Sequence, residues 1–519
     1  MASIVTYTMA GGTWNRLPLS YTTPIIVSVS ILVTIGVWFI GSYIQTRRQI
    51  RLPVPPGSYG LPWIGDTMNF MASSMSAVGY QKWIESKRRK YGALFKIRFL
   101  GNPLVLMEAP AGNKFLFQKE GKKQIDIYWP PQVARLFGRK AILNLGGEEH
   151  RVARRYVARF LDYTAVSRYV ETVERRTVQH FADHWEKEEI RGSESDTFVI
   201  AALDKTKLFT FSVMCSLVIS MDEGPEMEVL LGKFNTWARG FISLPINLPG
   251  FSFYNALKAR SYILDLFSTH IAQRTAQLAK DRPGASKTAA PDILTSLLTV
   301  ADENGELFSE TKIKDNLLTL LFGGFDTSST ALTMIIYYIA KYPRVYDQLL
   351  QEHRSILEQK RRKGDDEALI MTREDLSSMK YTWRVIQEAL RLQPPLTGGW
   401  RRATTDLEYN GYSIPKGWTM MWNNMNSHFD PKFFHDPTTF NPSRFEEPST
   451  ITPFTFLPFG AGTRFCPGNE FAKMEMLIFI HHLIKRYQWT LVDPDDPVIR
   501  DPMPMQRNRT LIKVTRRIL

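Results

Sequence analysis

The sequence predicts a mainly α-helical fold: a helix-rich body with small β-sheets, preceded by a single apolar helix near the N-terminus. Long segments repeat apolar residues with the period of a helix, whereas strand-like segments are few and short. Hydrophobic residues make up 44% of the 519 residues and charged residues 22%, as in a folded globular protein. The chain therefore has enough apolar material for a large core.

The first element is an apolar segment near the N-terminus. No charged residue lies between positions 17 and 46, and Pro24–Ile44 is long enough to span a bilayer as a helix. The positive-inside rule puts the rest of the chain in the cytosol, because one arginine precedes this segment and three follow it: Arg16, then Arg47, Arg48 and Arg51. A cleaved signal peptide is the alternative, but it has a shorter apolar core and basic residues before that core.

The predicted anchor divides the chain into four parts. Residues 1–23 form a short lumenal N-terminus, residues 24–44 the transmembrane anchor, residues 45–57 a basic and proline-rich hinge, and residues 58–519 one large domain. The hinge is stiff because Pro53, Pro55 and Pro56 cannot continue a helix.

The large domain alternates predicted helices with short strands. Helical periodicity is found at residues 151–161, 207–221, 258–280, 311–341, 344–359, 381–392 and 470–487. Strand-like segments are residues 94–99, 103–107, 407–409, 412–414 and 419–422. Polar composition predicts exposed connections at 281–291 and 360–367.

Charge and cysteine content limit the binding partners and the cellular compartment to be expected. The net charge is +14 and the pI about 9.5, which favours an acidic protein partner or an anionic membrane surface. No nucleic-acid-binding motif accompanies the charge, so we expect no nucleic acid partner. Two cysteines cannot build a disulfide framework, so a reducing compartment is expected. Cys215 lies in an apolar run and is expected to be packed in the core.

The most informative motif surrounds the second cysteine. Residues 459–468 read F-G-A-G-T-R-F-C-P-G and precede an amphipathic helical segment. We expect loop N–H groups and the positive end of that helix to lower the pKa of Cys466. Gly460 lets the backbone pass close under a flat group, and Arg464 can reach an anionic edge of it. These features fit a planar iron macrocycle with carboxylate arms; a buried, inert cysteine is the structural alternative.

The same stretch resembles the haem-binding signature of the cytochrome P-450 family, F-G-x-G-x-R-x-C-x-G. The resemblance extends from about residue 52 to the C-terminus and implies the fold of that family. It also implies haem b (iron protoporphyrin IX) as cofactor, Cys466 as the axial iron ligand, and contacts from Phe459, Gly460 and Arg464. The activity implied is mono-oxygenation of a lipophilic small molecule with O2.

A second motif interrupts the apolar segment 311–341. Residues 323–328 read G-G-F-D-T-S, and two glycines, an acid and two hydroxyls are unfavourable within a buried helix. The stretch resembles the oxygen-activation motif of the family, (A/G)-G-x-(D/E)-T-(T/S). The resemblance implies catalytic roles for Asp326, which supplies protons, and Thr327, which hydrogen-bonds dioxygen. A helix kink with a capping acid is the alternative.

Other motifs imply structural and cofactor contacts. Glu388 and Arg391 form E-x-x-R on one helical face, and Arg444 lies in P-S-R-F, similar to the P-x-R-F element of the family. Two arginines sharing one carboxylate would hold the cysteine loop in a structural role. The resemblance further implies that haem carboxylates are bound by a set of basic residues beyond Arg464, namely His150, Arg154 and Arg401. For His150 a surface histidine is the alternative.

The electron source is expected to be another protein. The chain shows no plausible Gly-rich dinucleotide fingerprint, and Arg151, Arg155 and Arg159 form a basic stripe at helical spacing. The stripe is either a solvated face or a docking surface for an acidic electron donor. The resemblance implies NADPH-cytochrome P-450 reductase as that donor, with cytochrome b5 as a second one. It also implies attachment to the endoplasmic reticulum membrane with the catalytic domain on the cytosolic face, in contact with membrane lipid.

Several segments look like the plant branch of the family that oxidises taxane diterpenoids, triterpenoids and steroids. They are residues 55–60, 241–251, 379–383 and 411–418. A taxane-type diterpenoid or a triterpenoid is therefore the favoured substrate, with a sterol as the third class. The alternatives are a reductase-independent haem-thiolate isomerase or dehydratase and a non-enzymatic membrane haem protein, and the Asp326–Thr327 pair argues against both. A membrane-tethered nucleic-acid binder is supported by net charge alone.

Overall fold

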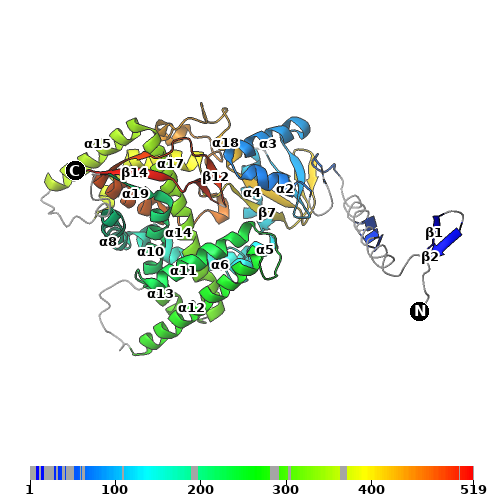
Figure 1. Ribbon diagram of the computed structural model, residues 1–519, viewed down its shortest axis with the longest axis horizontal. Helices are drawn as coiled ribbons and strands as arrows, with labels where there is room; N and C mark the ends of the chain where they lie inside the picture. The colour runs from blue at the N-terminus through cyan, green and yellow to red at the C-terminus, as the bar shows by residue number, and fades with distance from the viewer. Residues whose placement is uncertain are drawn as a thin grey trace.

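The structure of the protein is a computed structural model. It describes residues 65–517 except 108–109, 189–196, 281–291, 302–304, 363–370 and 502, together with 52–58, 60 and short stretches between 7 and 41. The described body is helix-rich with small sheets, as the sequence predicts (Figure 1). The predicted connections at 281–291 and 360–367 lie outside the described residues, except for residues 360–362. These form the end of a helix with Lys360 buried, so the expectation of an exposed connection is wrong there.

Every long helix predicted from hydrophobic periodicity is present. These helices are α6 (Gly147–Leu161), α10 (Ala202–Ile219), α12 (Ser252–Lys280), α14 (Glu310–Lys341), α15 (Pro343–Arg362), α17 (Lys380–Leu392) and α19 (Asn469–Arg486). Periodicity did not single out α2 (Thr67–Ser74), α3 (Ala77–Tyr91), α4 (Ala111–Gly121), α5 (Pro131–Phe137), α7 (Tyr163–Ser167), α8 (Val170–Phe181), α11 (Pro225–Ala238), α13 (Ile293–Thr299), α16 (Arg373–Ser378) and α18 (Met425–His428). Short 3-10 or π turns complete the set: η1 (Ala182–Glu186), η2 (Arg239–Ile242), η3 (Pro442–Phe445), η4 (Pro448–Thr450) and η5 (Gly462–Arg464).

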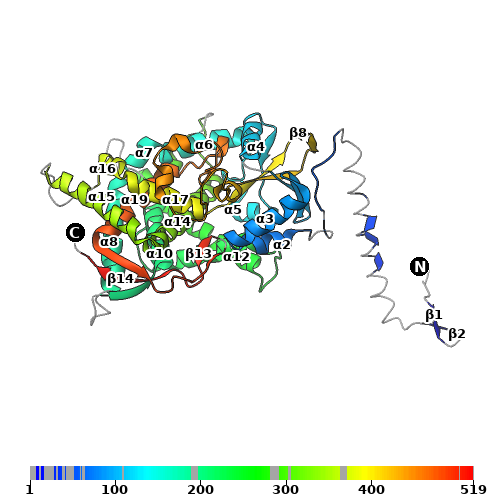
Figure 2. The same cartoon turned by 90° about the horizontal axis from the view of Figure 1, so that it is seen from above.

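Helix α14 runs through the middle of the helical part, with α10 beside it (Figure 1 and Figure 2). The Thr210 hydroxyl of α10 donates to the Phe325 carbonyl of α14 at 2.9 Å. A side chain at Gly324 would meet Met214 Sδ at 2.3 Å, so glycine is required for this close approach. The helix predicted over 311–341 is confirmed: α14 is continuous through residues 323–328, and Gly324 serves its packing against α10.

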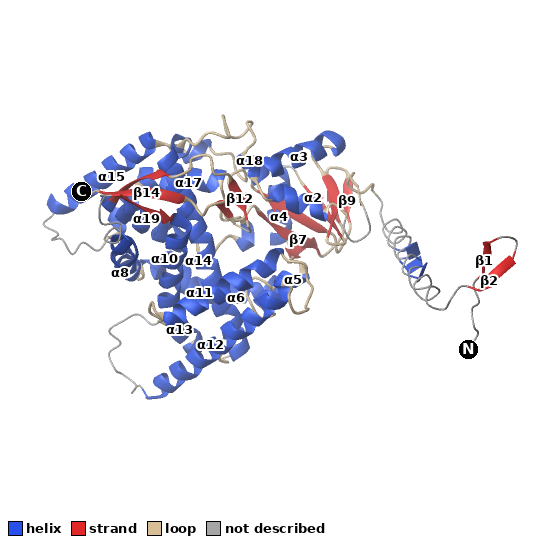
Figure 3. Ribbon diagram, in the orientation of Figure 1, coloured by secondary structure: helices blue, strands red, loops and turns tan. Residues whose placement is uncertain are grey.

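The strands gather in two main sheets, one beside α2 and α3 and the other near the C-terminus (Figure 3). The larger sheet has the order β3-β4-β10-β7-β5, with the bounds Phe95–Phe99, Asn102–Leu106, Thr419–Asn423, Gly398–Ala403 and Ile125–Ile127. Strand β10 runs parallel to β4, and the other neighbours pair antiparallel. The second sheet has the order β11-β14-β6, with the bounds Tyr487–Leu491, Leu511–Arg516 and Thr197–Ala201. Two-stranded pairs are β1–β2 (Tyr7–Ala10, Thr13–Arg16), β8–β9 (Leu407–Tyr409, Tyr412–Ile414) and β12–β13 (Val498–Arg500, Pro504–Gln506).

The predicted N-terminal anchor falls mostly outside the described residues. Between residues 24 and 44 the structure describes only 29–30, 33–34, 36–37 and 41. Among the described residues, no helix has the length and apolar character needed to cross a bilayer.

Candidate active site

The cysteine loop lies between the large sheet and the start of α19. The Cys466 amide donates to the Phe459 carbonyl at 2.9 Å, which closes the loop on itself. Gly460 and Gly462 have φ angles of 71° and 70°, a left-handed conformation that other residues rarely adopt. Phe459 packs against the main core, and Gly460 faces the Trp422 ring, so the loop backbone comes close to its neighbours.

The Cys466 thiol is half-buried next to α6. Burial raises its pKa, whereas the Gly468 N–H and the charge of Arg154 act in the opposite direction. The expected lowering of this pKa is therefore wrong, because α19 begins only at Asn469 and loss of water outweighs the helix end. Such a thiol loses its proton when a metal binds it. A surface pocket of about 200 Å³ between α6 and the start of α19 reaches this cysteine.

The predicted basic residues gather beside the loop. His150 and Arg154 lie on the inner face of α6, His150 buried and Arg154 half-buried. Arg401, in the middle of β7, has an exposed fraction of 3%. Burial lowers the pKa of His150 to about 3, and the charges of Arg464, Arg154 and Arg401 act in the same direction. His150 is therefore a neutral donor among three guanidinium groups.

Two acidic residues that the sequence reasoning missed lie among these cations. Glu120, in the last turn of α4, has its Oε1 atom 3.0 Å from Arg401 Nε and 3.7 Å from Arg464 Nε. Asp126, in β5, accepts from Arg464 Nη2 at 3.3 Å. No local sequence signal marks either residue, because their partners Arg401 and Arg464 lie far away in the sequence.

The residues around Arg401 fit a flat anionic group. The indole Nε1 atoms of Trp400 and Trp422 are buried without an acceptor among the described residues. A side chain at Gly399 would meet Trp422 Nε1 at 2.7 Å, so only glycine leaves this donor uncovered. Unpaired buried donors are costly unless a ligand accepts from them. Together with the thiol, these donors and guanidinium groups suit haem with its carboxylate arms.

Helix α14 is exposed at one place only in its centre. Between residues 315 and 339 all positions are buried except Gly323, Gly324 and Thr327. The Thr327 hydroxyl donates to the Gly323 carbonyl at 2.7 Å, on this open face. Asp326 is buried on another side of the helix, where its Oδ1 lies 3.1 Å from Lys207 Nζ of α10. The side chains of Asp326 and Thr327 therefore point in different directions from α14. The sequence did not reveal Lys207 as the partner of Asp326.

The E-x-x-R pair and the second arginine lie together in the interior. Arg391 forms two hydrogen bonds with Glu388, at 2.7 and 2.8 Å, and both side chains are fully buried. Arg444 Nε lies 3.2 Å from the same carboxylate. Arg391 also donates to the His428 carbonyl at 2.7 Å, and His428 accepts from the Leu457 amide at 3.3 Å. This chain of contacts joins α17 to the segment that leads into the cysteine loop.

A cluster of aromatic rings packs on α14 around Phe322. Phe137 of α5 stacks on Phe241 of η2 with ring centres 5.1 Å apart. Phe322, next to Gly323, contacts both rings, and Trp237 of α11 contacts all three. The cluster makes an apolar region next to Gly323 in the chain.

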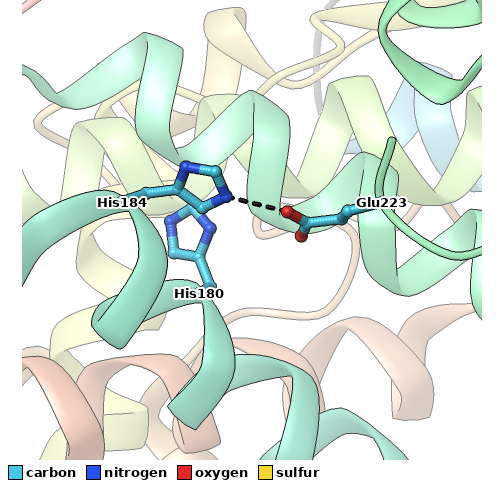
Figure 4. Close-up of side chains that lie close together, drawn as sticks. All are labelled: His180, His184 and Glu223. Atoms are coloured by element: carbon cyan, nitrogen blue, oxygen red, sulfur yellow. Dashed lines mark hydrogen bonds and ion pairs between the residues drawn. The ribbon is translucent and has the colours of Figure 1, made fainter. Parts of the chain in front are cut away.

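A separate cluster combines two histidines and a glutamate (Figure 4). His184 Nε2 lies 2.8 Å from Glu223, and the His180 ring is stacked at an angle beneath His184. His180 Nε2 accepts from the Trp185 indole at 3.3 Å, so its proton resides on Nδ1 and neither nitrogen has a free lone pair. A protonated nitrogen cannot bind a cation, and the cluster is better described as a hydrogen-bonded contact between η1 and the turn after α10.

The chain is similar to a well-populated protein family. The sequence model described as Cytochrome P450 matches residues 55–515. A beta-amyrin 28-monooxygenase of Kalopanax septemlobus is 36% identical over 484 residues, which cover 93% of this chain and 96% of the relative. A taxane 13-alpha-hydroxylase of Taxus cuspidata is 35% identical over 483 residues, covering 93% of this chain and 95% of the relative.

Solved structures agree. Retinoic acid-bound cyanobacterial CYP120A1 is 28% identical, with a TM-score of 0.77, and the match covers 90% of this chain and 100% of that chain. The predicted family, helix-rich fold and haem cofactor are confirmed by these matches. The chain belongs to the cytochrome P450 family and is a haem-dependent mono-oxygenase.

Proposed function

We propose that this mono-oxygenase oxidises a lipophilic polycyclic terpenoid. A taxane-type diterpenoid or a triterpenoid is favoured, and a sterol is the third class. The observation that carries this proposal is that relatives matching nine-tenths of the chain are beta-amyrin 28-monooxygenases and taxane or taxoid hydroxylases. The aromatic cluster of Phe137, Trp237, Phe241 and Phe322 supports it, because such rings suit a rigid, apolar ring system.

In this proposal the cysteine loop holds the haem, which supplies the oxygen-activating chemistry. Cys466 would bind the haem iron through its sulfur, and Phe459 and Gly460 belong to the loop that would hold the macrocycle. The haem carboxylates are bound by Arg464, His150, Arg154 and Arg401. The buried guanidinium groups and the neutral imidazole of His150 support this role, because each offers N–H donors where water is scarce.

Protons reach the open face of α14 through two residues. Thr327 holds a hydroxyl proton on that face, and its bond to the Gly323 carbonyl orients the side chain. Asp326 takes up protons on the side of α10, where Lys207 is partly exposed. Glu388, Arg391 and Arg444 have a structural role. The ion pairs of both arginines with the Glu388 carboxylate hold α17 against the segment before the cysteine loop.

The catalytic body, residues 58–519, works at the cytosolic face of the endoplasmic reticulum membrane. Residues 24–44 anchor it as a single transmembrane helix, after a lumenal segment 1–23 and before a hinge at 45–57. Leu244, Leu248 and Phe251 support contact with lipid, because these large apolar side chains of one loop are exposed by 44–60%.

Electrons come from a redox partner, which we take to be NADPH-cytochrome P-450 reductase, with cytochrome b5 as a second donor. Arg151, Arg155 and Arg159 support docking of an acidic partner, because all three are exposed on α6 while the opposite face carries His150. The pocket beside Cys466 opens along the same helix.

Expression with a plant reductase in yeast microsomes tests the substrate. Beta-amyrin-type triterpenes, taxadienes and sterols are supplied with NADPH, and products are identified by mass spectrometry. The expected result is an oxygenated triterpene or taxane that forms only with NADPH and is absent with Cys466→Ala. Product formed without NADPH would instead indicate an isomerase or dehydratase, and haem binding without turnover of any substrate would indicate a non-enzymatic haem protein.

A further inference from the structure

Glu120 is a buried acid inside the cluster of cations beside the cysteine loop. Its side chain, at the end of α4, has an exposed fraction of 4%. A side chain at Gly462 would come within 3.5 Å of Glu120 Oε2, so this carboxylate lies directly against the loop that carries the cysteine. A buried carboxylate is costly unless its charge is compensated.

One oxygen of Glu120 serves two guanidinium groups. Oε1 lies 3.0 Å from Arg401 Nε and 3.7 Å from Arg464 Nε. The two arginines carry like charges and repel each other, because both guanidinium groups approach the same oxygen. The carboxylate between them offsets this repulsion and fixes both side chains from the same side.

Glu120 leaves the outer ends of both arginines available. Arg401 Nε forms an ion pair with Glu120, and Arg401 Nη1 donates to the Trp400 carbonyl at 3.0 Å. Arg464 uses Nη2 for the Leu145 carbonyl at 2.5 Å and for Asp126. Among the described residues, no hydrogen bond uses Arg401 Nη2 or Arg464 Nη1, so each can meet a carboxylate of the cofactor.

The charges of the site balance only with Glu120. Arg154, Arg401 and Arg464 contribute three positive charges, His150 is neutral, and haem brings two carboxylates. One positive charge would remain in the interior, and Glu120 compensates it. Asp126 contributes less, because its side chain is 39% exposed and water screens it.

We propose that Glu120 is a positioning residue of the haem site: its carboxylate is the counter-ion that holds Arg401 and Arg464 ready for the haem carboxylates. This inference rests on the proposed role of both arginines as haem contacts. Glu120 itself touches neither the iron nor the substrate, and it acts through the two guanidinium groups.

The test uses the full-length haem protein carrying Glu120→Gln, which keeps the shape and removes the charge. Haem transfer to apomyoglobin should be about 10-fold faster, since a charge-assisted contact is lost. The haem reduction potential should rise, because a buried negative charge has gone. The carbon-monoxide spectrum should still report thiolate ligation. Glu148→Gln is the matched control: it removes an exposed carboxylate of α6 that pairs with Arg151, and it should change neither quantity.

Glu120→Asp keeps the proposal testable if Glu120→Gln does not fold. It retains the charge but withdraws it by one methylene, so haem loss should be intermediate and the potential close to that of the wild type. Unchanged haem retention and potential in Glu120→Gln, with a normal wild-type spectrum, would overturn the role of Glu120 alone. A wild-type protein whose spectrum lacks thiolate ligation would overturn the proposed haem site as well.

Discussion

Lys207 Nζ lies 3.1 Å from Asp326 Oδ1 and ties α10 to the centre of α14. The Asp326 side chain is 4% exposed and that of Lys207 25%, so the pair leads from the interior of α14 toward the surface. The neighbouring Thr327 faces the open side of the helix instead. A lysine on a different helix therefore holds the acid of the D-T pair.

Removal of Lys207 should destabilise the protein through Asp326. Lys207→Met leaves a buried carboxylate without its partner, and we expect a loss of about 1–3 kcal/mol, less than for a fully buried pair because Lys207 is partly exposed. The double variant Lys207→Met/Asp326→Asn should recover most of it. Urea unfolding of both single variants and the double variant gives the coupling energy, and additive effects would contradict the ion pair.

Asp326→Asn should slow turnover by about 100-fold, the usual scale for loss of a general acid. The substitution keeps the shape of the side chain, so haem content and the carbon-monoxide spectrum should not change. Product formation per haem, measured with saturating reductase, checks this result. Normal turnover in the variant would exclude Asp326 from proton delivery.

Thr327→Ala should uncouple NADPH consumption from product formation. The hydroxyl bonds only to the carbonyl of its own helix, so its loss should cost less than about 1 kcal/mol of stability. Peroxide released per NADPH should rise, while Thr327→Ser, which keeps a hydroxyl, should stay near the wild-type value. Equal peroxide yields for the two variants would contradict the role of this proton.

Glu388→Gln should destabilise the fold by about 3–5 kcal/mol, because the positive charges of Arg391 and Arg444 then lack a negative partner in the interior. The matched control is Glu446→Gln, which removes a 58%-exposed partner of Arg384 and should cost under about 1 kcal/mol. Chemical unfolding followed by tryptophan fluorescence and by the haem absorbance measures both losses. Similar costs for the two substitutions would show that the buried network contributes no more than a surface pair.

The long helices were predictable because several keep one continuous apolar face over many turns, as α15 and α17 do. The cysteine loop and the E-x-x-R pair were visible because their residues are close together in sequence. Glu120, Lys207 and His428 were not visible, since their partners are remote in the sequence. The same holds for Arg464 and Asp126, which are 338 positions apart. Such contacts depend on how elements pack, and a single sequence contains no local signal for them.

Buried histidines should make the protein sensitive to mild acid. His353 Nδ1 lies 3.0 Å from His481 Nδ1, and His353 Nε2 lies 3.1 Å from the Thr382 hydroxyl. Both ring nitrogens of His353 are therefore engaged, and a second proton on either ring of the pair would be repelled by its neighbour. Burial lowers the pKa of His353 and of His428 to about 3 and that of His481 well below 6.5. The folded protein therefore keeps these rings neutral.

The sign of the effect follows from proton uptake. Below pH 6.5, the ordinary histidine pKa, the unfolded chain binds protons that the folded protein does not, so stability is complete above 6.5 and falls as the pH drops toward the folded pKa. Each such histidine should cost about 1.4 kcal/mol between about pH 7.5 and about pH 5.5. His353→Gln should reduce this slope, whereas replacing His435, whose side chain is 91% exposed, should not. Urea midpoints at several pH values check this, and identical slopes for His353→Gln and the wild type would mean that the buried pair takes no part in acid unfolding.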